Sequence, residues 1–183
     1  MSFPFHIDDA PLLSHQLEQP RRRVATPDRQ GRDWEKEFGQ AVRCTDAWFT
    51  DSNDRKAVND CRFTYLGHSF LGEMKKTESA TLALSVVSKA QVGYLDAHVA
   101  AGGTSFLAIK RVLPGWQARV FCVNWMVAKR LGRRTIQLDN PPPELIEIFE
   151  MERPHGLGTA WDLQPFIDAS FTAYLQRLEI FRQ

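Results

Sequence analysis

Two short runs of β-favouring residues joined by a tight turn constrain the fold of this chain more than any other feature. The runs are residues 61–66 (CRFTYL) and residues 69–75 (SFLGEMK). Gly67 and His68 between them suit a two-residue hairpin loop, and both runs are rich in aromatic and branched side chains. The sequence therefore predicts an antiparallel hairpin over residues 61–75.

The register of this hairpin decides which charged side chains meet. If Leu66 pairs with Ser69, Asp60 lies opposite Lys75 and is a diagonal neighbour of Glu73, about 7 Å away at the backbone. Opposed residues share a face of a sheet, so two carboxylates and an ammonium project to one side. Such carboxylates can hold a hard cation, and the ammonium can reach a phosphate. The alternative is a set of cross-strand ion pairs on a solvated face, which contribute little to stability.

Length and charge set broad limits on the rest of the chain. The 183 residues suffice for one domain with a hydrophobic core. The 23 Lys and Arg nearly balance the 22 Asp and Glu, but residues 20–32 hold five arginines against one aspartate. Such a cluster can follow nucleic-acid phosphates, or it can be a solvated surface. The candidate phosphate-binding residues are Arg21, Arg22, Arg23, Arg29 and Arg32, with Lys76 directly after the hairpin.

The cysteines and the hydropathy indicate an intracellular setting. Cys44, Cys61 and Cys122 are odd in number and lack C-x-x-C spacing, so neither a disulfide framework nor a zinc site is expected. A reducing compartment fits this usage best. No apolar run reaches the length of a membrane span, and the N-terminus lacks the pattern of a secretory signal. We expect a soluble, cytoplasmic protein without a membrane partner.

Proline spacing and apolar periodicity predict the domain organisation. Four prolines among polar residues favour a flexible basic arm over residues 1–30. A single domain is then expected over 31–183, with a core at 31–138 and a helical part at 141–183. Helices are expected over 32–47, 86–100, 125–131, 144–149 and 165–181. Further strands are expected over 104–109, 116–123 and 135–138.

Gln91 stands out on the second expected helix, residues 86–100, because it lies within the apolar stripe that should face the core. A buried amide is costly unless its donors and acceptors have partners. Two interpretations remain open. Either the amide bonds locally to the backbone, or it reaches a polar site beneath the helix.

The order helix, hairpin with D-x(12)-E-x-K, helix, strand resembles the PD-(D/E)XK nucleases, and within them the Holliday junction resolvases of RecU type. The likeness extends over residues 31–123. It rests on G-x-x-x-E at 31–35, on Asp60, on E-x-K at 73–75, on Gln91 and on the glycine-led strand from Gly102. Asn59 stands where the family has a proline, and the region after residue 123 has no clear counterpart.

The resemblance implies a fold and an activity. The expected fold is an α/β, restriction-endonuclease-like core, with a central mixed β-sheet, flanking helices and an active site on the N-terminal hairpin. The expected activity is Mg²⁺-dependent endonucleolytic hydrolysis of branched DNA, with Mn²⁺ as a possible substitute. The substrate so implied is the four-way junction of DNA recombination and repair, cut by a homodimer.

The resemblance also implies roles for individual residues. Lys75 would position or deprotonate the attacking water, and Gln91 would orient Lys75 or the phosphate. Glu35 would bind the metal directly or through water, and Met74 would contribute its carbonyl. The implied metal ligands are Asp60, Glu73, Met74 and Glu35. The implied catalytic residues are Glu35, Asp60, Glu73, Lys75 and Gln91.

Two alternatives stay open. One is another nuclease of the same superfamily, acting in repair, replication or restriction on ordinary duplex or flapped ends. The other is a non-catalytic DNA-binding protein whose acidic residues are structural.

Overall fold

A computed structural model describes residues 27–45, 47–50, 60–131, 135–152 and 159–180; side chains are not described for residues 27–32, 48–50, 116 and 152. The helices are α1 (Pro27–Arg43), α2 (Lys89–Ala100), α3 (Trp125–Leu131) and α4 (Gln164–Ile180), with 3₁₀ turns η1 (Leu84–Val86) and η2 (Pro114–Trp116). The first strands are β1 (Trp48–Thr50), β2 (Cys61–Tyr65), β3 (His68–Thr77), β4 (Thr81–Ala83) and β5 (Thr104–Val112). The later strands are β6 (Ala118–Asn124), β7 (Thr135–Gln137), β8 (Ile146–Ile148), β9 (Glu150–Glu152) and β10 (Thr159–Trp161).

The central sheet has six strands in the order β1-β2-β3-β5-β6-β8. Strands β3 and β5 are parallel, and the other neighbours are antiparallel, so the sheet is mixed. The parallel pair needs a crossover, which α2 provides. The expected α/β architecture, with a mixed sheet that includes the hairpin and with flanking helices, is confirmed.

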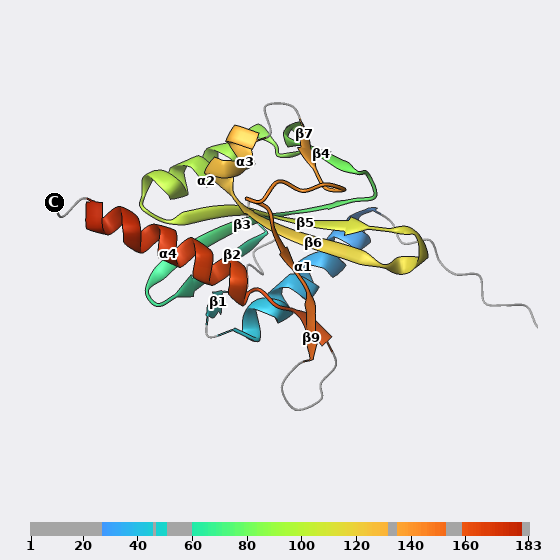
Figure 1. The fold of residues 1–183 in the computed structure, drawn as a ribbon, viewed down its shortest axis with the longest axis horizontal. Helices are drawn as coiled ribbons and strands as arrows, with labels where there is room; N and C mark the ends of the chain where they lie inside the picture. Colours follow the sequence, from blue (N-terminus) through green and yellow to red (C-terminus); the bar gives the residue numbers. More distant parts are fainter. Residues whose placement is uncertain (1–26, 46, 51–59, 132–134, 153–158, 181–183) are drawn as a thin grey trace, which may run out of the picture.

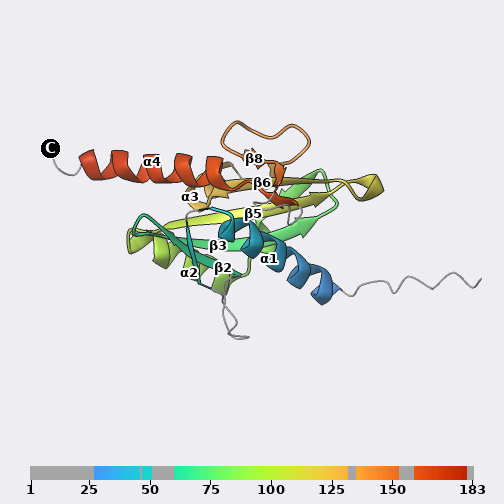
Figure 2. The same cartoon turned by 90° about the horizontal axis from the view of Figure 1, so that it is seen from below.

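Helices cover both faces of the sheet (Figure 1). Helices α1 and α4 contribute to the hydrophobic cluster on one face, and α2 and α3 contribute to the cluster on the other. Figure 2 shows α4 above the sheet and α2 below it. Because successive strand residues point to opposite faces, each strand supplies both clusters. On β3, Phe70 and Met74 join the α1 side, whereas Leu71 joins the α2 side.

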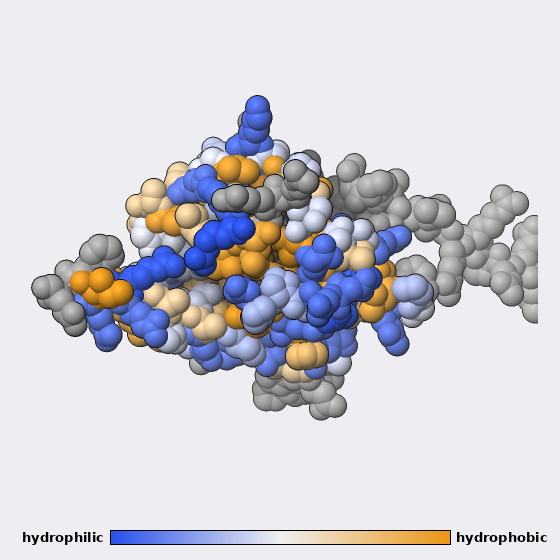
Figure 3. Space-filling model, turned by 45° about the horizontal axis from the view of Figure 1, so that its top comes forward, coloured by the Kyte–Doolittle hydropathy of each residue, from blue (hydrophilic) through white to orange (hydrophobic). Residues whose placement is uncertain are grey.

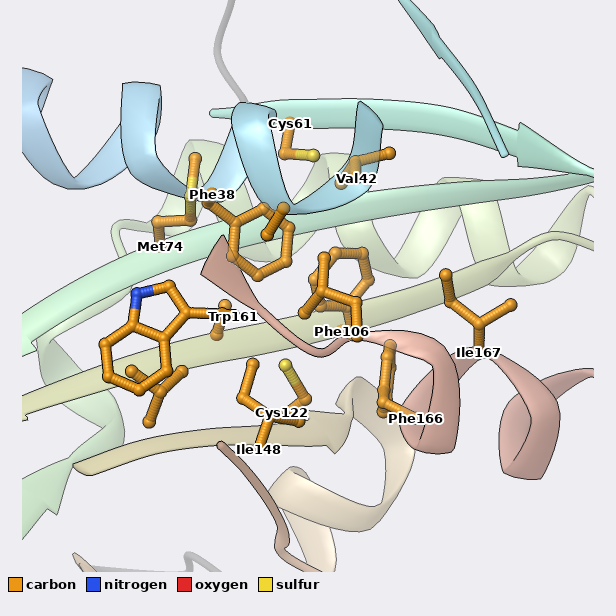
Figure 4. Close-up of a cluster of buried hydrophobic side chains, with 14 of the residues drawn as sticks. Phe38, Val42, Cys61, Met74, Phe106, Cys122, Ile148, Trp161, Phe166 and Ile167 are labelled. Atoms are coloured by element: carbon orange, nitrogen blue, oxygen red, sulfur yellow. The ribbon is translucent and has the colours of Figure 1, made fainter. Parts of the chain in front are cut away.

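One cluster fills the space between the sheet, α1 and the start of α4 (Figure 4). Phe38 of α1 stacks on Phe106 of β5, with ring centroids 5.8 Å apart, and Phe166 of α4 packs against the same ring at 5.1 Å. Gly72 lies beneath this ring, where a β-carbon would come within 2.3 Å of the Phe106 side chain. A larger side chain at 72 would therefore force the ring of Phe106 to shift.

Helix α1 begins earlier than the sequence predicted. It starts at Pro27 rather than near residue 32 and ends at Arg43 rather than residue 47. Proline favours the first helical position, where its missing N–H is not needed. The predicted arm over 1–30 is therefore helical in its last four positions, and residues 1–26 lie outside the described part.

The helix predicted over 144–149 is wrong, because this segment forms strand β8. Residues Ile146 and Ile148 pair with Cys122 and Val120 of β6. Ile148 is buried in the cluster beside α1, and β-branched residues suit a pleated sheet. Pairing with an open strand edge outweighed the local preference of this segment.

The hairpin exists as predicted, but its turn and register differ. Tyr65 pairs with His68, so the loop residues are Leu66 and Gly67. Both have positive φ, 48° and 80°, as a type I′ turn requires. The predicted register was offset by two residues, which keeps every side chain on its predicted face. With the observed register, the position opposite Glu73 is that of Asp60 rather than Arg62.

The last half of α4 extends beyond the sheet (Figure 1). Near the hairpin, Tyr174 stacks on His68 with ring centroids 3.8 Å apart, and Phe171 contacts Tyr65. Further along, Leu175, Leu178 and Ile180 are exposed. Figure 3 shows hydrophobic side chains at the left end of the molecule, where α4 ends. None of the helices in the described ranges is long and apolar enough to cross a membrane.

Candidate active site

Glu73 is a carboxylate with no exposed surface at the centre of the sheet. Its strand β3 has a partner on each side, with Leu107 of β5 beside it in the register. Alternation along β3 turns Glu73 and Lys75 toward α2, and Met74 toward the opposite cluster. An acid at such a position must be compensated locally, because burial of an unpaired charge is costly.

Two donors converge on one oxygen of Glu73. Lys75 Nζ lies 2.6 Å from Glu73 Oε1, and Gln91 Nε2 donates to the same oxygen at 2.5 Å. The other oxygen, Glu73 Oε2, is buried and has no hydrogen-bond partner among the described residues. The ionised carboxylate is therefore held by one oxygen, and the other is left for a proton or a cation.

Asp60 stands at the entry to β2, next to Glu73 in the hairpin register. Its Oδ2 accepts a hydrogen bond from the backbone N–H of Met74 at 2.8 Å. This bond fixes the side chain of Asp60 against β3. The two carboxylates interact directly, through their charges and through a hydrogen bond that forms when one of them is protonated.

This environment raises the pKa of Glu73 from 4.5 to about 8. Burial is the largest cause, followed by the negative charge of Asp60, and the ammonium of Lys75 opposes both. The metal-free site thus favours a protonated Glu73 at neutral pH. A cation bound between Asp60 and Glu73 would compensate the negative charge of Glu73, which the proton neutralises in the metal-free protein.

Gln91 makes both of the contacts that the sequence left as alternatives. Its Oε1 accepts from the backbone N–H of Ser88 at 2.9 Å, and its Nε2 donates to Glu73. Ser88 also accepts from the backbone N–H of Gln91 through its Oγ at 3.3 Å, which completes a capping box at the start of α2. The helix terminus and the carboxylate site are therefore linked through a single amide.

The donor set fits a divalent cation bound by two carboxylates. Asp60 and Glu73 offer oxygen ligands, which Mg²⁺ and Mn²⁺ prefer, and Glu73 Oε2 has no described partner. No group of three or more His, Cys, Asp or Glu side chains that could hold a metal occurs in the described part of the chain. Main-chain carbonyls and water would have to complete the coordination, as is usual for Mg²⁺.

Glu35 belongs to α1, which packs on the face of the sheet opposite to α2. Glu35 itself is exposed. Its neighbour Glu37 forms an ion pair with Lys110 of β5, which ties α1 to the sheet. The role of Glu35 as a metal ligand remains a prediction.

The predicted phosphate-binding residues are only partly described. Lys76 is exposed on β3, directly after the site. Arg29 and Arg32 belong to α1, but their side chains are not described. Arg21, Arg22 and Arg23 lie outside the described residues.

Ser88 was missed by the sequence analysis. The pattern S-x-x-Q at 88–91 is a capping-box signature that could have placed the start of α2 and the orientation of Gln91. The predicted start at residue 86 obscured it, since the observed helix begins at Lys89 after the 3₁₀ turn η1.

No family model and no curated protein matches the sequence. Among solved structures, the chain is similar to Hjc, a Holliday junction resolvase from the archaeal hyperthermophile Archaeoglobus fulgidus. The likeness covers 61% of this chain and 86% of the Hjc chain, with 21% sequence identity and a TM-score of 0.37.

Proposed function

We propose that this chain is a Mg²⁺-dependent DNA endonuclease that cuts branched DNA at four-way junctions by hydrolysis of a phosphodiester. The observation that carries the proposal is the convergence of four polar residues. Asp60 and Glu73 face each other at the end of a hairpin, Lys75 and Gln91 hold one oxygen of Glu73, and its other oxygen has no described partner. An ion-pair network on a solvated face would not bury Glu73 completely.

Each side chain has a chemical task in this mechanism. Asp60 and Glu73 Oε2 would hold the cation, and the carbonyl of Met74 would add a ligand. A bound Mg²⁺ supplies charge neutralisation at the phosphate and lowers the pKa of a coordinated water. Lys75 is partly exposed while it contacts Glu73, so its ammonium can position the attacking water and offset the phosphate charge.

Basic residues of the N-terminal segment would contact phosphates of the DNA backbone. Arg21, Arg22, Arg23, Arg29 and Arg32 precede or begin α1, and Lys76 follows the site on β3. Phosphate contacts give salt-sensitive binding with little base readout, which suits recognition by shape. Replacement of Arg21, Arg22 and Arg23 by Gln should reduce the slope of log K against log salt by roughly 0.9 for each phosphate that is no longer neutralised.

A homodimer suits this substrate, because a four-way junction presents two symmetric strands to be cut. An isologous dimer supplies two matched sites. The exposed end of α4 offers an apolar surface, with Leu175 at 44% exposure, Leu178 at 38% and Ile180 at 72%. Light scattering should give the mass of a dimer for the wild-type chain and a lower mass for Leu178→Glu; a monomeric wild type would refute the dimer.

Cleavage of a labelled four-way junction tests the function directly. The wild-type chain should cut the junction with Mg²⁺ and leave a linear duplex of the same sequence largely intact. Glu73→Ala should abolish cutting, whereas Glu78→Ala, an exposed acid on the turn after β3, should retain it. Equal cutting of junction and duplex would indicate another nuclease of this kind. Failure of the wild type to cut any DNA would favour the non-catalytic DNA-binding protein.

A further inference from the structure

We propose that Ser88 is a positioning residue for the metal site. Its backbone N–H fixes the amide of Gln91 in the one orientation that donates to Glu73 and leaves Glu73 Oε2 for the cation. The proposal rests on the proposed function, since it concerns the same site. It adds Ser88, which does not contact Glu73 but determines the orientation of the Gln91 amide.

The amide of Gln91 has one accepting end and one donating end. The backbone N–H of Ser88 can only donate, and it lies 2.9 Å from the oxygen of that amide. A rotated amide would set two donors against each other at this point. The contact therefore determines that Nε2 faces Glu73 Oε1, at 2.5 Å.

The choice of residue at 91 follows the same logic. A capping box is formed equally well by Glu or Gln at the third helical position. A glutamate here would accept from Ser88 but would turn a second carboxylate oxygen toward Glu73. Only glutamine satisfies the helix terminus and also donates to the site.

As a consequence, the two oxygens of Glu73 have different roles: one accepts hydrogen bonds and the other is left for the cation. Oε1 receives both Lys75 and Gln91, whereas Oε2 has no partner within the described ranges. Without the donor from Gln91, Oε1 would keep the flexible side chain of Lys75 as its donor. Loss of partners around a metal ligand typically lowers metal affinity or activity about 10- to 100-fold.

The backbone at Ser88 permits a selective test. Its φ of −65° matches the angle that a proline ring imposes, and Val87 before it is extended with ψ of 115°, as a residue before proline prefers. Ser88→Pro therefore removes the N–H without backbone strain. Ser88→Ala removes the Oγ cap but keeps the N–H, so the comparison of these two variants isolates the N–H.

The first measurement needs neither metal nor DNA. In the metal-free protein, the side-chain amide signals of Gln91 in a ¹⁵N–¹H spectrum report its hydrogen bonds. These signals should coincide in the wild type and in Ser88→Ala, and should shift in Ser88→Pro. Coincident signals in all three proteins would overturn the proposal, whether or not the chain proves to be a nuclease.

The second measurement is the Mg²⁺ concentration for half-maximal cutting of the junction. It should be about 10- to 100-fold higher for Ser88→Pro than for Ser88→Ala. Gln91→Met removes both ends of the amide and should give a similar rise. The double variant Ser88→Pro, Gln91→Met should be no worse than either single variant, because residues that act through one contact are not additive. Equal values for Pro and Ala at 88, or an additive double variant, would contradict the proposal.

Discussion

Replacement of Glu73 by glutamine should stabilise the metal-free protein while it removes a proposed metal ligand. The carboxyl group has no exposed surface, and its Oε2 has no hydrogen-bond partner in the described structure. The introduced glutamine would keep the shape of the side chain and its acceptor for Lys75 and Gln91. Its own amide group could then donate toward Asp60. The variant thus tests whether the site is organised for a cation at the expense of stability.

The magnitude follows from the pKa of Glu73, which rises from 4.5 to about 8 on folding. Between these values the folded chain keeps a proton that the unfolded chain releases, so the stability of the wild type falls as pH rises through this window. Each pKa unit corresponds to about 1.4 kcal/mol, and pH 7 lies about 2.5 units above 4.5, which gives about 3 kcal/mol. Glutamine does not titrate, so the variant does not lose this stability as pH rises.

Urea unfolding followed by tryptophan fluorescence provides the assay, since Trp34 and Trp125 are buried and will report unfolding. Wild type and Glu73→Gln should be compared in EDTA at several pH values from 4.5 to 8. The variant should be nearly equal to the wild type at pH 4.5 and more stable by about 3 kcal/mol at pH 7. Titrating groups that do not interact with Glu73 cancel in this difference because both proteins share them.

Glu78→Gln is the matched control, because Glu78 is exposed on the turn after the same strand. Its effect should stay within about 0.5 kcal/mol at every pH. A Glu73→Gln variant that is less stable than the wild type at pH 7 would refute the reasoning. So would a stability difference that does not change with pH.

Three individual residues give further predictions. Gly72→Ala should destabilise the fold by about 1–3 kcal/mol in urea unfolding, because its β-carbon would overlap the ring of Phe106. Burial, followed by the charges of His98 and Arg177, lowers the pKa of His68, so wild-type stability should fall relative to His68→Phe between pH 7.5 and pH 5.5. Lys75→Ala should slow junction cutting at least about 100-fold in a gel assay while junction binding persists, if this ammonium acts on the water.

The faces of the hairpin could be predicted because alternation in a strand has a period of two. An error of two residues in the register left Asp60, Glu73 and Lys75 on one side. The turn itself was not predictable from the glycine alone, since the fold places Leu66, a residue that rarely adopts positive φ, at the first loop position.

Segments whose partners are distant in sequence were harder to predict. Residues 144–149 carry helix-favouring glutamates, and only the unpaired edge of β6 makes them a strand. The position of Glu35 relative to the site was equally hard to predict from the sequence. The sequence places it on an amphipathic helix, but the packing of that helix against the other face of the sheet sets its distance from the hairpin acids.

Binding of Mn²⁺ to the DNA-free protein tests the central claim most directly, with the signal of the unbound ion followed by electron paramagnetic resonance. Asp60 and Glu73 should together be required for binding. The wild type and Glu78→Gln should therefore deplete the unbound ion alike, and Asp60→Asn and Glu73→Gln should not. Equal depletion by all four proteins would contradict a cation site between these two carboxylates.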